Sequence, residues 1–336
     1  MKTMTTSPMD VAERAGGCLL GLAIGDALGG PTEGKTPDAI AALWGRVTDF
    51  LSDTQGGSDD TEHALFNARL LLRHRGSLDA GIIAEAWKSD ILPGANGFKG
   101  AGFSEMLALR NLREGLLPPR SGEHVHSWSD GLAMRVAPFG IVAAGDPKRA
   151  AHLALMDGSV TNAGEGIYSG QAVAAGVAVA MVGAPPGESL DAALAVIPED
   201  SWTWRAIARG RAIGEQSTDV WTALKPLYDA IAVTSYFWSD VAPEAVGLAF
   251  GILAAAKGDF RAGVLGAVNI GRDTDTIAAI VGAILGAEAG ASHLPAEWKK
   301  RIGPSQGTCI AAVKGMDIAE TALQLSRLAG GAGGKE

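Results

Sequence analysis

Apolar residues recur along this chain at the three- and four-residue spacing of amphipathic α-helices, and the alternation typical of β-strands is scarce. Only 6% of the residues are aromatic, which also argues against a sheet-based fold. The pattern predicts an all-α protein. The predicted helices cover Ala12–Ala23, Ser58–Leu72, 79–90, Met106–Leu112, Gly131–Pro138, a stretch after Asp146, Gly166–Gly187, 202–232, Ala245–Ala256, Ile277–Ala287 and Asp317–Leu328.

The chain has no repeat of fixed period and no linker that would separate two domains. We expect one all-helical domain over residues 11–328, with flexible tails over residues 1–10 and 329–336. Hydrophobic residues make up 47% of the 336 residues, which allows a large core. The 46 glycines and the many alanines suggest helices that pack closely through small side chains.

One uncharged stretch, Gly166–Gly187, is long enough to cross a bilayer. It contains Ser169 and Gln171, however, and consists mostly of Ala, Val and Gly rather than strongly apolar residues. We therefore expect a buried helix of a soluble protein and no membrane partner.

The formal net charge of −9 argues against general nucleic-acid binding, because such proteins are usually basic. Cys18 and Cys309 provide neither a disulfide framework nor a zinc spacing. The first residues also lack the apolar run of a signal peptide. These features together lead us to expect a cytoplasmic protein.

The first predicted helix has Asp10 as its expected N-cap. Glycine-rich sequence from Gly25 to Gly30 should end this helix and form a turn that carries Asp26 and Glu33. Taken by themselves, these two acids are better explained by an ordinary loop with solvated side chains.

Acidic residues and hydroxyls gather at two further helix starts. Asp273, Asp275 and Thr276 precede one apolar helical run, and Ser58, Asp59 and Asp60 open another, with Ser58 as the expected N-cap. Carboxylates at a helix start interact favourably with the helix dipole, so neither group requires a ligand by itself. Hard oxygen donors of this kind also suit a divalent cation such as Mg²⁺ or Mn²⁺.

If the two groups converge, with Glu33 as a further acid, their charges would repel strongly unless cations neutralise them. Two divalent cations would do so, and one carboxylate, preferably that of Asp275, could bridge them. Such two-metal sites orient a substrate and activate water. The sequence therefore predicts a binuclear centre, on the condition that these distant helix starts meet.

Two further interpretations of the sequence, both involving phosphate, are less well supported. Asp-x-Asp-x-Thr after a strand is a phosphatase-type nucleophile motif, but here Thr276 follows the second aspartate directly and no β-branched strand precedes it. The glycine-rich stretch Pro93–Ser104 can offer backbone N–H groups to phosphate at a helix start. Its spacing matches neither a P-loop nor a dinucleotide fingerprint.

Taken together, the motifs resemble those of the ADP-ribosylglycohydrolase family. The pieces that carry the resemblance are Gly21–Gly29 with Glu33, Ser58–Thr61, Ala133–Pro138 and Asp273–Ala278, in the family's order. The resemblance implies a compact, orthogonally packed all-α domain with two Mg²⁺ or Mn²⁺ ions. It assigns the metal ligands to Ser58, Asp59, Asp60, Asp273, Asp275 and Thr276.

By the same resemblance, Glu33 and Asp60 are the candidate catalytic residues, and Glu33 positions or deprotonates the attacking water. Three positions depart from the family pattern, namely Asp130, Asn162 and Arg272, where Asn, His and Gly are usual. Arg272 could pair with a ligand carboxylate or reach a substrate oxygen. The candidate substrate-binding residues are Gly100, Gly102, Phe103, Gly131, Met134, Asn162 and Arg272.

The function that the resemblance implies is hydrolysis of the glycosidic bond at ribose C1″ of an ADP-ribosyl substrate. That substrate would be an ADP-ribosylated protein or a small ribosyl metabolite. One alternative is a hydrolase of a small ribosyl N-glycoside, such as a modified nucleoside. Another is a protein that binds ADP-ribose or metal without catalysis.

Overall fold

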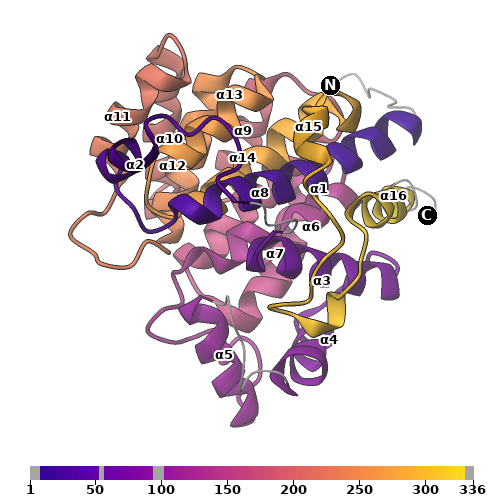
Figure 1. Ribbon diagram of the computed structural model, residues 1–336. Coiled ribbons are helices and arrows are strands. Elements are labelled where there is room, and N and C mark those ends of the chain that lie inside the picture. Colours follow the sequence, from indigo (N-terminus) through magenta and orange to yellow (C-terminus); the bar gives the residue numbers. More distant parts are fainter. Residues whose placement is uncertain (1–7, 53–56, 94–101, 330–336) are drawn as a thin grey trace.

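Helices joined by turns make up the chain in the computed structural model, which describes residues 8–52, 57–93 and 102–329 (Figure 1). Within these ranges there is no β-strand, and only two isolated bridges form, Lys35 with Arg272 and Ser129 with Val241. The all-α prediction is confirmed. The two expected tails fall almost wholly outside the described residues.

The α-helices are α1 (Pro8–Gly29), α2 (Pro37–Trp44), α3 (Asp59–Arg73), α4 (Ala80–Ala86), α5 (Phe103–Arg113), α6 (Ala137–Val142), α7 (Pro147–Thr161), α8 (Glu165–Ala180), α9 (Pro186–Ala195), α10 (Trp202–Gln216), α11 (Val220–Ile231), α12 (Ala242–Ala256), α13 (Phe260–Asn269), α14 (Thr274–Ala289), α15 (Ala296–Lys299) and α16 (Ile318–Ala329). Shorter helical turns are η1 (Gly30–Thr32), η2 (Trp87–Ile91), η4 (Asp130–Arg135), η5 (Ala291–His293) and η6 (Ala311–Val313).

The closest helix pair in the core is α1 with α14, which lie side by side near the middle of Figure 1. Glycines at every fourth position of α1, from Gly17 to Gly29, face the backbone of α14. A Cβ added at Gly25 would lie 2.0 Å from the carbonyl oxygen of Ala278. Only glycine permits so close an approach of two backbones. This packing brings the end of α1 against the start of α14.

The first helix is longer than the sequence pattern predicts, in both directions. It begins at Pro8, so Asp10 lies inside it and is not the N-cap. It also continues through Gly25 to Gly29, so the expected turn is wrong and Asp26 lies on the helix. Glycine is a poor helix former, but burial of these glycines against α14 stabilises the helix.

Other predicted helices differ in their boundaries. The stretch 202–232 forms two helices, because Asp219 accepts a hydrogen bond from the backbone N–H of Thr222 and starts α11. The stretch Gly131–Pro138 forms the 3₁₀ turn η4 followed by α6. The start of α11 follows from a local hydrogen bond that periodicity alone does not reveal.

Most of the uncharged stretch forms α8, which ends at Ala180 rather than at the predicted Gly187. Its residues from Ala172 to Ala178 are buried. It packs against α6, α7 and α9. This agrees with the predicted buried helix. No helix in the described ranges combines the length and hydropathy that crossing a bilayer requires.

Candidate metal centre

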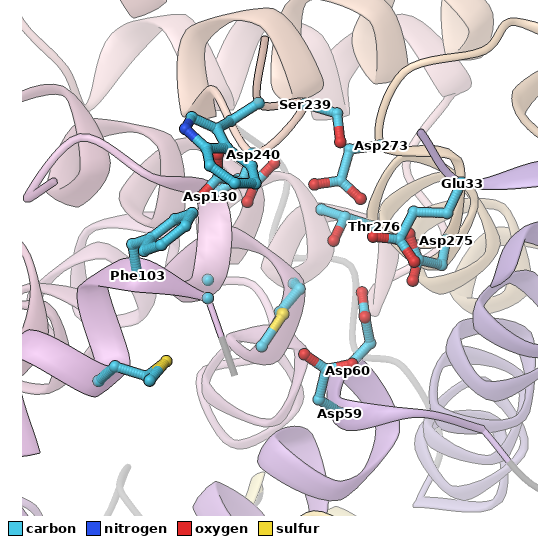
Figure 2. Close-up of a pocket in the computed structure, with 15 residues that line it drawn as sticks. Glu33, Asp59, Asp60, Phe103, Asp130, Ser239, Asp240, Asp273, Asp275 and Thr276 are labelled. Carbon is cyan, nitrogen blue, oxygen red and sulfur yellow. The ribbon is translucent and has the colours of Figure 1, made fainter. Parts of the chain in front are cut away.

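A pocket opens where the end of α1 and the starts of α3 and α14 meet (Figure 2). Its lining residues are Glu33, Asp59, Asp60, Gly102, Phe103, Met106, Asp130, Gly131, Met134, Trp238, Ser239, Asp240, Asp273, Asp275 and Thr276. The two acidic helix starts predicted from the sequence therefore lie in one pocket.

Asp26 attaches the start of α3 to α1. Its carboxylate accepts hydrogen bonds from the Ser58 backbone N–H and hydroxyl at 2.9 and 2.8 Å, and from the Thr61 hydroxyl at 2.5 Å. Ser58 occupies the N-cap position as predicted, but its side chain does not cap the helix. Because its hydroxyl donates to Asp26, the lone pairs of its oxygen remain available to a cation.

The start of α14 is attached to the end of α1 through threonines. The Thr274 hydroxyl donates to the carbonyl oxygen of Gly29 at 2.9 Å, and the Thr32 hydroxyl donates to Thr274 at the same distance. Thr274 thus attaches α14 to the end of α1, while its neighbours Asp273 and Asp275 line the pocket. The first turn of α14 therefore has one side that packs against α1 and one side that lines the pocket.

The carboxylates form two groups that share one member. Oxygens of Asp26, Asp60 and Asp275 lie within 4.8 Å of one another. Oxygens of Glu33, Asp273 and Asp275 do the same. Asp275 belongs to both groups, which is the position that a bridging carboxylate would need.

Three carboxylate oxygens in the pocket are buried and have no hydrogen-bond partner among the described residues: Oδ1 of Asp60, Oδ2 of Asp130 and Oδ1 of Asp275. Burying such atoms unpaired is costly. Burial, and then repulsion from neighbouring acids, raises the pKa of Asp60 and Asp275 well above the usual value. The same causes raise the pKa of Asp59 to about 7.

No Lys, Arg or His belongs to the lining residues that the structure describes. Positive charge must therefore come from a ligand if the carboxylates are to be ionised together. The donors are hard oxygens, which is the set that Mg²⁺ and Mn²⁺ bind. The residues present fit the predicted binuclear centre.

A second acidic wall, which contains Asp130, Asp240 and Phe103, lies opposite Asp59 and Asp60 (Figure 2). Its Asp130 is next to Asp273. Burial and the nearby Asp240 raise the pKa of Asp130 well above its usual value. Phe103 and Trp238 complete this wall, with ring centroids 4.8 Å apart and planes at 67°. This side of the pocket therefore combines negative charge with aromatic surface.

Arg135 lies outside the pocket lining and stabilises η4, the turn that contributes Asp130. Its buried guanidinium forms ion pairs with Glu105 at 2.7 Å and Asp157 at 2.8 Å, and it donates to the Thr161 hydroxyl at 2.7 Å. The buried guanidinium therefore has both the ion-pair and the hydrogen-bond partners that a buried charge requires. The arginine of the Ala133–Pro138 motif is thus a structural support of the pocket.

The predicted substrate-binding residues lie in different places. Gly102, Phe103, Gly131 and Met134 line the pocket, and Gly100 lies outside the described residues. Asn162 is buried, and its amide donates to the carbonyl oxygens of Ser127 and Ser129. Arg272 is also outside the lining and pairs with Glu244 rather than with a predicted ligand.

Trp238, Ser239 and Asp240 line the pocket although no sequence motif predicts them. They belong to no motif, and they reach the pocket because the chain between α11 and α12 folds over it. The role of Asp26 was also missed. The sequence predicts a turn at this residue, and the helix that directs Asp26 towards Ser58 and Thr61 appears only in the structure.

The fold and the pocket define an all-helical protein with a carboxylate-rich site suited to divalent cations. The family model described as ADP-ribosylglycohydrolase matches residues 7–332. The chain therefore belongs to the ADP-ribosylglycohydrolase family, as the sequence motifs predicted, and this membership supports a glycohydrolase activity.

Individual relatives agree with this assignment. An uncharacterized protein of Archaeoglobus fulgidus is 34% identical over 294 residues, which cover 85% of this chain and 90% of that protein. A Pseudomonas putida protein named ADP-ribosylarginine hydrolase Tri1 is 26% identical, covering 91% of this chain and 78% of its own. A solved structure titled ADP-ribosylglycohydrolase-related protein complex has the same fold, with a TM-score of 0.68 and 24% identity over 96% of this chain and 99% of its own.

Proposed function

We propose that this protein hydrolyses the glycosidic bond at ribose C1″ of an ADP-ribosyl group, with two divalent cations as cofactors. The observation that carries the proposal is the position of Asp275, whose carboxylate belongs to both acidic groups of the pocket. Family membership supports the reaction class. The unpaired buried oxygens of Asp60 and Asp275 support the cations.

The residues that would hold the cations are Ser58, Asp59, Asp60, Asp273, Asp275 and Thr276. When bound, the cations would orient ribose hydroxyls and lower the pKa of a water molecule. Mg²⁺ and Mn²⁺ both bind hard oxygen donors of this kind.

Glu33 is the proposed general base. Its carboxylate lies at the edge of the pocket, open to solvent, within 4.8 Å of carboxylate oxygens of Asp273 and Asp275. Desolvation raises the pKa of Glu33 in spite of nearby Lys35, and a raised pKa makes a carboxylate a better base. Glu33 would accept a proton from water as the water oxygen bonds to C1″. The bond from C1″ to the leaving group breaks, and its electron pair goes to the leaving nitrogen or oxygen.

Asp60 is the second proposed catalytic residue. It extends from the first turn of α3, and its carboxylate lies within 4.8 Å of an oxygen of the shared Asp275. It would keep the reacting ribose aligned through the cation it holds. Phe103, Gly102, Gly131 and Met134 line the side of the pocket on which the rest of the substrate would lie. Asn162 would act on that side through the Ser127–Ser129 segment, which it supports.

The group from which the ADP-ribose is released is suggested by one relative and by the charge of the pocket. The Pseudomonas putida relative is named for ADP-ribosylarginine, and the negative wall of Asp130 and Asp240 would suit a guanidinium leaving group. ADP-ribosylarginine is therefore the first substrate to test, as a free compound and on protein. We expect the reaction in the cytoplasm.

A second candidate function is hydrolysis of a small ribosyl N-glycoside. It is favoured by the absence of Lys, Arg and His from the lining residues that the structure describes. A diphosphate is usually held by such cations or by backbone N–H groups. A non-catalytic role is less well supported, because Glu33 and all the proposed ligands except Ser58 line the pocket.

Calorimetric titration of ADP-ribose into the protein separates these functions. Binding that requires Mg²⁺ or Mn²⁺ and disappears with a chelator would support the ADP-ribosyl hydrolase. Turnover of ADP-ribosylarginine and of nucleosides is then compared. Release of free base from nucleosides, without binding of ADP-ribose in the presence of metal, would overturn the first function in favour of the second.

A further inference from the structure

Arg272 has an unusual backbone conformation beside the candidate metal centre. Its φ angle is 69°, in the left-handed region that side chains other than glycine seldom adopt. Its N–H donates to the carbonyl oxygen of Lys35, and its carbonyl oxygen accepts from the N–H of Gly34, both at 2.9 Å. The backbone of Arg272 therefore attaches the segment after Glu33 to the start of α14.

The side chain of Arg272 binds a different segment, the chain that joins α11 to α12. Its Nε donates to the carboxylate of Glu244 at 2.5 Å, and its Nη2 donates to the carbonyl oxygen of Trp238 at 2.9 Å. Longer contacts of 3.4 Å reach the carbonyl oxygens of Val233 and Tyr236. One guanidinium thus holds both ends of residues 233–238.

Residues 233–240, here called the wall segment, supply Trp238, Ser239 and Asp240 to the pocket. The segment has few other attachments. Glu244 accepts from the N–H of Val233, and the carbonyl oxygen of Asp240 accepts from the N–H of Asp130 at 3.3 Å. The rings of Tyr236 and Trp238 contact Trp128 and Phe103, whereas the side chain of Phe237 is 85% exposed. Arg272 and Glu244 supply most of the hydrogen bonds that attach this segment.

We propose that Arg272 is a positioning residue that fixes the wall segment, and with it Trp238 and Asp240, against the candidate metal centre. A planar guanidinium can donate to a carboxylate and to several carbonyl oxygens at once, which an ammonium cannot do in the same geometry. Charge-assisted hydrogen bonds are also the stronger kind. The proposed position of the wall segment depends only on these contacts. The kinetic effect expected below depends in addition on the proposed function.

Proteolysis with chymotrypsin tests the position of the wall directly. The enzyme cleaves after aromatic residues, and the wall segment contains Tyr236, Phe237 and Trp238 in sequence. Arg272→Gly removes the guanidinium while glycine keeps the positive φ without strain. We expect cleavage in this segment, mapped by mass spectrometry, to be at least about tenfold faster, because cleavage follows the population of the open form.

Arg75→Gly is the matched control, because Arg75 is exposed and also has a positive φ, of 54°. It should leave the cleavage rate unchanged. Arg272→Lys should fall between wild type and Arg272→Gly. If Arg272→Gly does not fold, Glu244→Gln weakens the same attachment by removing its charge, and it should also accelerate cleavage. Wild-type cleavage rates in a folded Arg272→Gly or Glu244→Gln protein would overturn the proposal.

Kinetics add a readout that a general loss of stability would not produce. With a substrate identified, Arg272→Gly should raise KM while kcat changes much less, since Trp238 and Asp240 would bind the substrate but have no proposed part in activating the water. Failure to find any substrate would count against the proposed function alone, because the proteolysis result needs no turnover. Turnover together with unchanged cleavage rates would overturn only the role of Arg272.

Discussion

Asp60 and Asp275 bring carboxylate oxygens to within 4.8 Å of each other, although they lie in the first turns of helices far apart in the sequence. Each has a buried oxygen without a hydrogen-bond partner among the described residues. Repulsion between them contributes to the raised pKa of Asp60. A cation between them would turn this repulsion into attraction.

Asp275→Asn should abolish stabilisation of the protein by metal. A cation that binds only the folded state stabilises it by about 2.7 kcal/mol at 100 times its Kd. Thermal unfolding of wild type in Mn²⁺ should show this gain, and the Asp275→Asn protein should show little of it. Asp146→Asn is the control, since Asp146 is an exposed N-cap and asparagine caps equally well. Full Mn²⁺ stabilisation of the Asp275→Asn protein would exclude the bridging role.

Glu33→Gln should reduce kcat by about 10²- to 10⁴-fold, the usual contribution of a positioned general base. Stabilisation by Mn²⁺ should be retained, because the proposal assigns Glu33 to proton transfer and not to the cations. Steady-state kinetics and thermal unfolding measure the two effects. Glu85→Gln changes an exposed surface carboxylate and serves as the control. Loss of Mn²⁺ stabilisation would instead make Glu33 a ligand.

Gly25→Ala should destabilise the fold by about 1–3 kcal/mol or more, because overpacking forces two backbones apart. The new Cβ would lie 2.0 Å from the carbonyl oxygen of Ala278. Chemical denaturation measures the loss. Gly30→Ala is the control, because nothing lies within 4 Å of a Cβ at that position, and its effect should stay within about 0.5 kcal/mol. Equal stability of the two variants would contradict the proposed role of the glycine stripe.

Glu288 should make stability depend on pH. Burial raises the pKa of its carboxyl from 4.5 to about 7, against weaker lowering by the Ser189 hydroxyl and Arg14. Because the folded state holds this proton more tightly than the unfolded state, stability should fall as pH rises from about 4.5 to 7 and remain lower above 7. Glu288→Gln cannot ionise, so it should be more stable than wild type at pH 8 by on the order of 1–3 kcal/mol.

Urea denaturation at pH 4.5 and pH 8 tests this, since the difference between Glu288→Gln and wild type should be small at the lower pH. Glu123→Gln, at an exposed carboxylate, should show no such dependence. A helical rise of about 1.5 Å per residue places Glu288 about 20 Å from Asp275 on α14. Metal should therefore leave the difference unchanged.

The helical period and the acidic motifs are local properties, and the sequence revealed them. It predicted the all-α class, the helix starts at Ser58 and Asp273, and the family. It failed where packing overrides local preference. Gly25 should break a helix in isolation, yet α1 continues through it because α14 requires a surface without side chains there.

The convergence of the acids was a hypothesis that only the tertiary structure could decide. Sequence order does not specify which helix starts meet, because that depends on how closely α1 and α14 pack. The same holds for Trp238 and Asp240, which belong to no motif and reach the pocket through a turn that Arg272 holds from outside it. Residue types set the chemistry that is available, and the close contact of two glycine-lined helices sets which of those residues share a pocket.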